Sequence, residues 1–107
     1  MDSLLRQQEI DRNLSKAVLH YRERGEAYAV TERDYRVALA KKMLELKTQG
    51  MSVTLIHDLS RGDEEVSNKK LQRDIALSAL ESLKEAINVM KLQLRILREE
   101  ITEDRRG

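Results

Sequence analysis

The sequence predicts an all-α protein: a long helical hairpin, antiparallel and coiled-coil-like, with a short connector helix. Apolar residues recur at helical spacing in two long stretches, and Gly50 and Gly62 lie between these stretches. The 107 residues include no Pro and four Gly, so little in the composition interrupts long helices. A chain of this length is expected to form one helical domain, residues 1–107.

The first long helix is expected over about residues 4–49. Its apolar seam would use Leu14, Val18, Tyr21, Tyr28, Tyr35, Leu39 and Leu46, with Gly25, Glu32 and Lys42 filling the remaining positions. A Gly inside a helix costs about 1 kcal/mol relative to Ala, and Thr31 with Asp34 resembles an N-terminal cap. The sequence therefore leaves two alternatives for the first helix: a continuous helix, or one with a bend or break between Gly25 and Thr31. Gly50 is placed to end the helix as its left-handed residue.

A short connector helix is expected over residues 51–62. Thr54 is a possible N-cap, and Gly62 a second stop signal. Leu55, Ile56 and Leu59 form an apolar group that a floppy loop would leave in water. His57 and Asp58 are interpreted as surface or capping residues.

The second long helix is expected over about residues 63–104, with Asp63 as its cap and acidic residues in its first turn. It carries the strongest pattern in the chain, an a/d heptad seam. This predicted hairpin seam consists of Leu80, Leu83, Ile87, Met90, Leu94, Leu97 and Ile101.

The same helix carries a second apolar face. It consists of Ile75, Ala79, Ala86, Val89 and Ile96, at the c and g positions of that register. One antiparallel neighbour covers only one stripe, so this face predicts a homo-oligomer or a protein partner.

Arg73 occupies an a position of the heptad, where a buried unpaired charge would cost several kcal/mol. It is expected to pair with an acid such as Glu45, to reach solvent, or to lie where the register is loose. The alternative is a functional role, in which Arg73 fixes the hairpin register or meets the carboxylate of a partner.

Tyr21, Tyr28 and Tyr35 are seven residues apart and are the only aromatic residues. They are expected to pack on the second helix with their hydroxyls at the edge. The alternatives are a docking stripe for a partner, or a platform for stacking the bases of single-stranded nucleic acid.

Charge and composition argue against several functions. The net charge is +1, and no third of the chain is strongly basic, which disfavours nucleic acid. Cys is absent and no phosphate-binding or nucleophile motif occurs, so no catalytic residue, metal or cofactor is expected. His20 and Glu23 are interpreted as a solvated pair. No signal peptide or membrane span is expected, which predicts a cytoplasmic protein.

Residues 38–100 resemble a group of small helical accessory proteins encoded by temperate phages of Gram-positive bacteria. The resemblance is carried by residues 38–46, 50–62 and 85–97, and most specifically by Val-Thr-Leu-Ile at 53–56 with the following Asp-Leu and Arg-Gly pairs. It implies a phage accessory protein acting in the host cytoplasm and supplies no catalytic residues.

The sequence predicts a non-enzymatic helical binding protein, and the resemblance implies a stoichiometric inhibitor or modulator of a host protein or defence system. The alternative is a factor for phage recombination or replication that contacts nucleic acid. A structural or assembly role ranks third, and an enzyme last.

Overall fold

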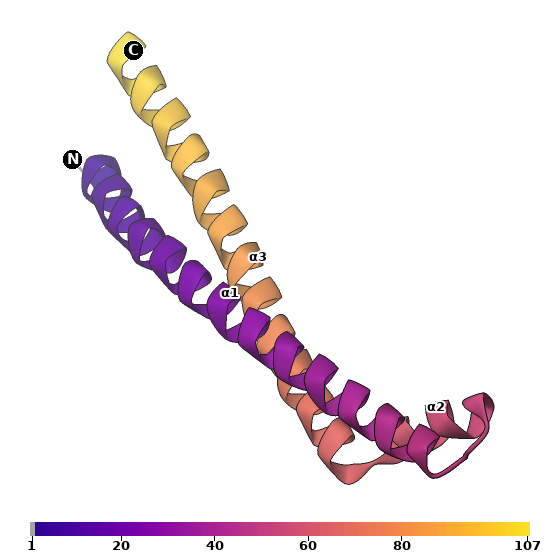
Figure 1. The fold of residues 1–107 in the computed structure, drawn as a ribbon. Helices are drawn as coiled ribbons and strands as arrows, with labels where there is room; N and C mark the ends of the chain where they lie inside the picture. Colours follow the sequence, from indigo (N-terminus) through magenta and orange to yellow (C-terminus); the bar gives the residue numbers. More distant parts are fainter. Residues whose placement is uncertain (1) are drawn as a thin grey trace. The chain divides into compact units, whose positions relative to one another are not determined.

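The computed structural model describes residues 2–107, in which every regular element is a helix. The helices are α1 (Asp2–Thr48), α2 (Val53–Gly62) and α3 (Glu64–Arg106), as labelled in Figure 1. α1 packs against α3 and α2 connects them, which confirms the predicted all-α hairpin. The expected helix limits lie within about two residues of these bounds, the ordinary uncertainty of helix ends.

α1 has no break between Gly25 and Thr31. The Thr31 hydroxyl donates to the carbonyl oxygen of Tyr28 at 2.9 Å, inside the helix, so Thr31 does not cap a new one. Gly25 lies within α1 and does not have a positive φ; among the described residues only Gly50 does. The helix accommodates Gly25 because its neighbours on both sides are good helix formers in a continuous hydrogen-bonded ladder.

The end of α1 is a Schellman motif around Gly50, whose φ is 81°. The amide of Gly50 donates to the carbonyl of Lys47 at 3.0 Å, and the amide of Met51 donates to the carbonyl of Leu46 at 3.3 Å. These bonds satisfy carbonyl groups that a helix end would otherwise leave open. The prediction that Gly50 ends the first helix is confirmed.

The cap of α2 is Ser52 and not Thr54, so that prediction was wrong. The Ser52 hydroxyl accepts a hydrogen bond from the amide of Leu55 at 3.4 Å, whereas Thr54 lies within the first turn. α2 ends at Gly62 without a left-handed residue, because Asp63 turns the chain by adopting an extended conformation. Asp63 caps α3 as expected, accepting a hydrogen bond from the amide of Val66 at 3.1 Å.

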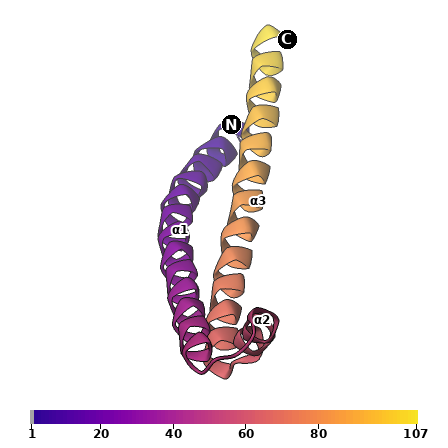
Figure 2. The ribbon, with the colours of Figure 1, turned by 45° about the vertical axis from the view of Figure 1, so that its right-hand side comes forward.

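Contacts group the described residues into two units, and one of them comprises residues 25–79. Its core consists of Ala38, Leu46, Ile56, Ser60 and Val66. Figures 1 and 2 both show the second half of α1 beside the beginning of α3 in this unit.

Two ion pairs define the helix register in this unit. Lys42 pairs with Asp63 at 3.4 Å, and Glu32 pairs with Arg73 at 3.3 Å. The step from Lys42 to Glu32 runs back along α1 by as many residues as the step from Asp63 to Arg73 runs forward along α3. Equal steps in opposite directions are what an antiparallel pairing requires.

The other unit comprises residues 2–24 and 80–107 of the described chain. Ala17 of α1 and Ile87, Leu94 and Leu97 of α3 are buried in it. The remaining predicted seam residues, Leu80, Leu83, Met90 and Ile101, are half-buried. Val18, expected in the α1 seam, is exposed, whereas Ala17 is buried: both three- and four-residue steps after Leu14 fit a heptad, so spacing alone did not distinguish them.

Candidate functional site

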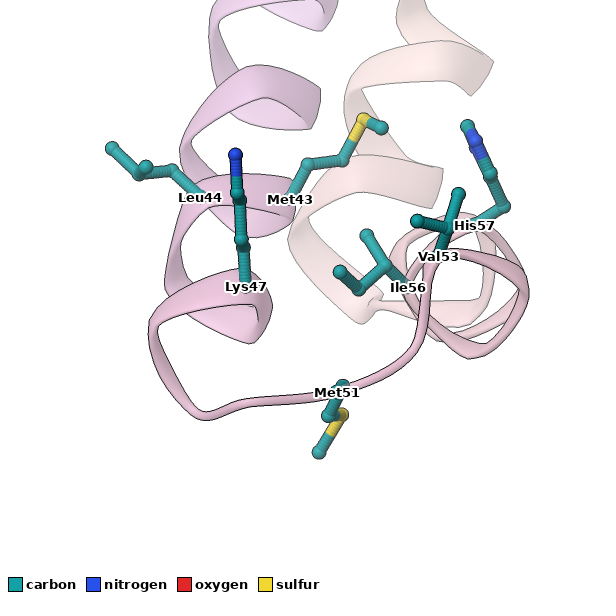
Figure 3. A pocket seen from close by; sticks show the side chains of 7 residues that line it. All are labelled: Met43, Leu44, Lys47, Met51, Val53, Ile56 and His57. Carbon is teal, nitrogen blue, oxygen red and sulfur yellow. The ribbon is translucent and has the colours of Figure 1, made fainter.

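An apolar groove lies between the end of α1 and α2, within residues 25–79. We call it the tip groove; it has a volume of about 450 Å3. Figure 3 shows side chains from α1 on one side and from α2 on the other, with Ile56 pointing from α2 toward α1. Its lining residues are Met43, Leu44, Lys47, Met51, Val53, Ile56 and His57.

The rim of the tip groove holds the two most exposed large apolar side chains of the described chain. Val53 is 72% exposed and Leu44 is 65% exposed. Local geometry explains both positions. Val53 shares a helical stripe with the buried Ile56 and Ser60 but is the first residue of α2, at the end of that stripe, and Leu44 points away from the α1 face that buries Leu46.

The tip groove is cationic at its edges and lacks a carboxylate among its lining residues. Lys47 and His57 are its ionisable side chains. Lys47 takes part in none of the ion pairs within residues 2–107, whereas nearby Lys42 is held by Asp63 and by Glu45. Lys47 is therefore free to meet a carboxylate from outside the chain.

Arg73 joins α3 to α1 at a polar layer in the seam of the same unit. Its guanidinium contacts Glu32 at 3.3 Å and Asp74 at 2.9 Å, and lies 4.6 Å from the centre of the Tyr35 ring. Glu45, the partner suggested by the sequence, is paired with Lys42 instead. The antiparallel register explains the error, because it brings Glu32 opposite Arg73.

Charged neighbours shift the acid–base equilibria of this layer. The guanidinium of Arg36, and then that of Arg73, lower the pKa of the Glu32 carboxyl. The Asp74 carboxylate, and then that of Glu32, raise the pKa of Arg73. The amide of Val66, followed by Lys42, lowers the pKa of the Asp63 carboxyl. All these charges are paired within the chain, so Arg73 pairs with an acid of the first helix as expected, although that acid is Glu32.

The three tyrosines are half-buried. Tyr21 lies in the unit of residues 2–24 and 80–107, whereas Tyr28 and Tyr35 lie in the other. Arg73 covers one face of the Tyr35 ring, which leaves less of that ring for a partner or a base.

The second apolar face of α3 is partly exposed. Ile75 is exposed and Ala79 half-buried in the unit of residues 25–79. In the other unit Val89 and Ile96 are exposed, and Ala86 is half-buried.

Potential metal ligands are not clustered in residues 2–107. His20 and Glu23 form an exposed pair at 3.5 Å, as expected, and no three metal-binding His, Cys, Asp or Glu side chains come together in the described chain. None of the described helices combines the length and apolar character needed to cross a membrane.

Sequence reasoning missed the tip groove. Leu44 falls outside the predicted α1 seam, and Val53 was expected in the connector without a role. Of the connector's apolar group, Ile56 is buried, but Leu55 and Leu59 remain exposed. The sequence signal that could have indicated the groove is Leu44, a large apolar residue outside the seam, two positions before the seam residue Leu46 and three before Lys47.

Comparison with known proteins adds no relative. No protein-family profile matches the chain, and neither a curated protein nor a solved structure matches it. The resemblance to phage accessory proteins stays a prediction.

Proposed function

We propose that this chain is a non-enzymatic binding protein that inhibits or modulates a protein partner stoichiometrically, by docking it at the tip groove. The observation that carries the proposal is that Leu44 and Val53, both largely solvent-exposed, line one apolar groove. Exposed large apolar groups that gather in one place are typical of interaction sites. The phage resemblance would make the partner a host protein, met in the host cytoplasm.

A macromolecular partner suits the tip groove better than a small molecule. Ligand pockets usually bury most of the ligand surface, whereas a groove with rim residues as exposed as Leu44 and Val53 encloses little. Met43 and Met51 provide flexible, polarizable walls, which are common at surfaces that adapt to a protein partner.

Affinity capture from a Gram-positive bacterial lysate tests the proposal. The bait is the full chain, compared with Leu44→Glu and with Leu71→Glu, which alters another exposed leucine in the same unit but outside the tip groove. We expect one protein to be retained by wild type and by Leu71→Glu and to be lost with Leu44→Glu, because a charge in the groove would have to be desolvated.

Nuclease treatment of the same samples separates the alternative function. Retention that survives Leu44→Glu, or that disappears after nuclease treatment, would contradict docking at the tip groove. The second outcome would favour contact with nucleic acid, and binding to single-stranded DNA should then weaken steeply with salt.

A further inference from the structure

An exposed apolar stripe runs along α1 into the tip groove. It consists of Val30, Val37 and Leu44, all exposed and each seven residues from the next. All three lie within residues 25–79, and Leu44 belongs to both the stripe and the groove. Stripe and groove therefore form one continuous surface, which we call the docking strip.

The spacing of the docking strip matches a helix. Apolar residues that recur every seven positions form one seam of a coiled coil, and a second helix can lie along them. From Val30 to Leu44 the stripe is about 21 Å long at the helical rise of 1.5 Å per residue. A partner helix of about 14 to 18 residues would cover it and reach the tip groove.

The charges along the docking strip are mostly basic. Beside Val37 lies a shallow depression lined by Arg33, Asp34, Val37, Ala38, Lys41, Glu65 and Lys69, the last two from α3. Together with Lys47, the strip thus presents four Lys or Arg side chains against two carboxylates. Asp34 is already paired with Arg33 at 3.2 Å, whereas Lys41 and Lys47 take part in none of the ion pairs of the described chain.

We propose that the partner docks an acidic amphipathic helix on the docking strip, with apolar side chains on Val30, Val37 and Leu44 and carboxylates facing Lys41 and Lys47. This inference rests on the proposed function and specifies the partner's chemistry. Flanking charges on a coiled-coil seam select the partner, because like charges across it repel. A basic helix is disfavoured on the same ground.

Selection from a displayed library of random 18-residue peptides, with the purified full chain as target, tests the inference. We expect enriched peptides to carry apolar residues at heptad spacing, with Asp or Glu beside them. Binding of an enriched peptide should weaken about 10-fold or more with Leu44→Glu. It should weaken about 5-fold or more with Lys41→Glu and Lys47→Glu combined, and should fall as salt rises.

Lys70→Glu and Leu71→Glu are the matched controls, because both residues are exposed on α3 outside the strip. Neither should change binding more than about 2-fold. Enriched peptides that depend on Leu44 but lack an acidic preference would overturn the inference and leave the proposed function standing. Failure to enrich any Leu44-dependent peptide would overturn both.

Two further measurements cover other occupants of the strip. A wild type that dimerises in light scattering, with Leu44→Glu monomeric, would show that a second copy fills the strip and would overturn the inference. Displacement of the bound peptide by an oligothymidine at physiological salt would assign the strip to nucleic acid and would also overturn it. We expect neither result.

Discussion

Leu94 and Leu92 provide a matched test of the hairpin seam in the unit of residues 2–24 and 80–107. They are two residues apart on α3, and a two-residue step places them on different faces. Leu94 is 4% exposed and Leu92 is 46% exposed. The same change, Leu to Ala, therefore removes a buried side chain at one position and a half-covered one at the other.

The expected cost at Leu94 is about 3 kcal/mol. Buried Leu→Ala replacements cost about 2–5 kcal/mol, and a seam between two helices can partly close over the lost volume, which favours the lower part of that range. Leu92→Ala loses less apolar burial and leaves no enclosed cavity, so we expect about 1 kcal/mol or less. Against a total stability of about 5–15 kcal/mol, only Leu94→Ala should weaken the hairpin severely.

Urea unfolding followed by far-UV circular dichroism measures the difference. With an m value of about 2 kcal/mol per molar, Leu94→Ala should lower the midpoint by about 1.5 M and Leu92→Ala by about 0.5 M or less. Each protein is measured at two concentrations, because self-association would stabilise the folded state by mass action. Equal shifts for the two variants, independent of concentration, would refute the assignment of Leu94 to a buried seam.

The fully buried Ser60 hydroxyl has no hydrogen-bond partner within residues 2–107, so Ser60→Ala should raise stability by about 1 kcal/mol in urea unfolding; a loss would reveal a hidden partner. A Cβ at Gly25 would meet nothing within 4 Å beyond its own helix, so Gly25→Ala should raise the thermal midpoint, corresponding to about 1 kcal/mol. Glu32 and Asp63 have lowered folded-state pKa values, so the unfolded chain binds more protons in acid. The stability that these two carboxylates provide is complete above the ordinary carboxyl range near about pH 4 and is lost as pH falls through the folded-state pKa values. Replacing both by their amides should therefore reduce the fall in the free energy of unfolding toward acid pH. An unchanged fall would contradict this prediction. Ile96→Glu should dissociate an assembly in light scattering while helix content stays intact, and a strictly monomeric wild type would remove that expectation.

Local signals in the sequence were sufficient for the three helices, for the end of α1 and for the start of α3. Gly50 and Asp63 act through their own backbone and nearest neighbours, so their roles follow from the order of residues alone. The heptad of α3 likewise identifies its inward side, since Ile87, Leu94 and Leu97 are all buried. These features depend on contacts within a few residues along the chain.

Which side chains pair between α1 and α3 depended on the tertiary structure. A heptad shows that Arg73 faces inward, but only the register of α1 against α3 decides between Glu32 and Glu45 as its partner. The choice of Ser52 over Thr54 as the cap followed from where α2 begins after Gly50.

The tip groove likewise required the position of α2 against the end of α1, because Leu44 and Val53 line one groove only when the chain turns back. The sequence by itself determined which side of α3 is buried. The tertiary structure decided which groups meet, because the spacing along one helix carries no information about the offset of the other.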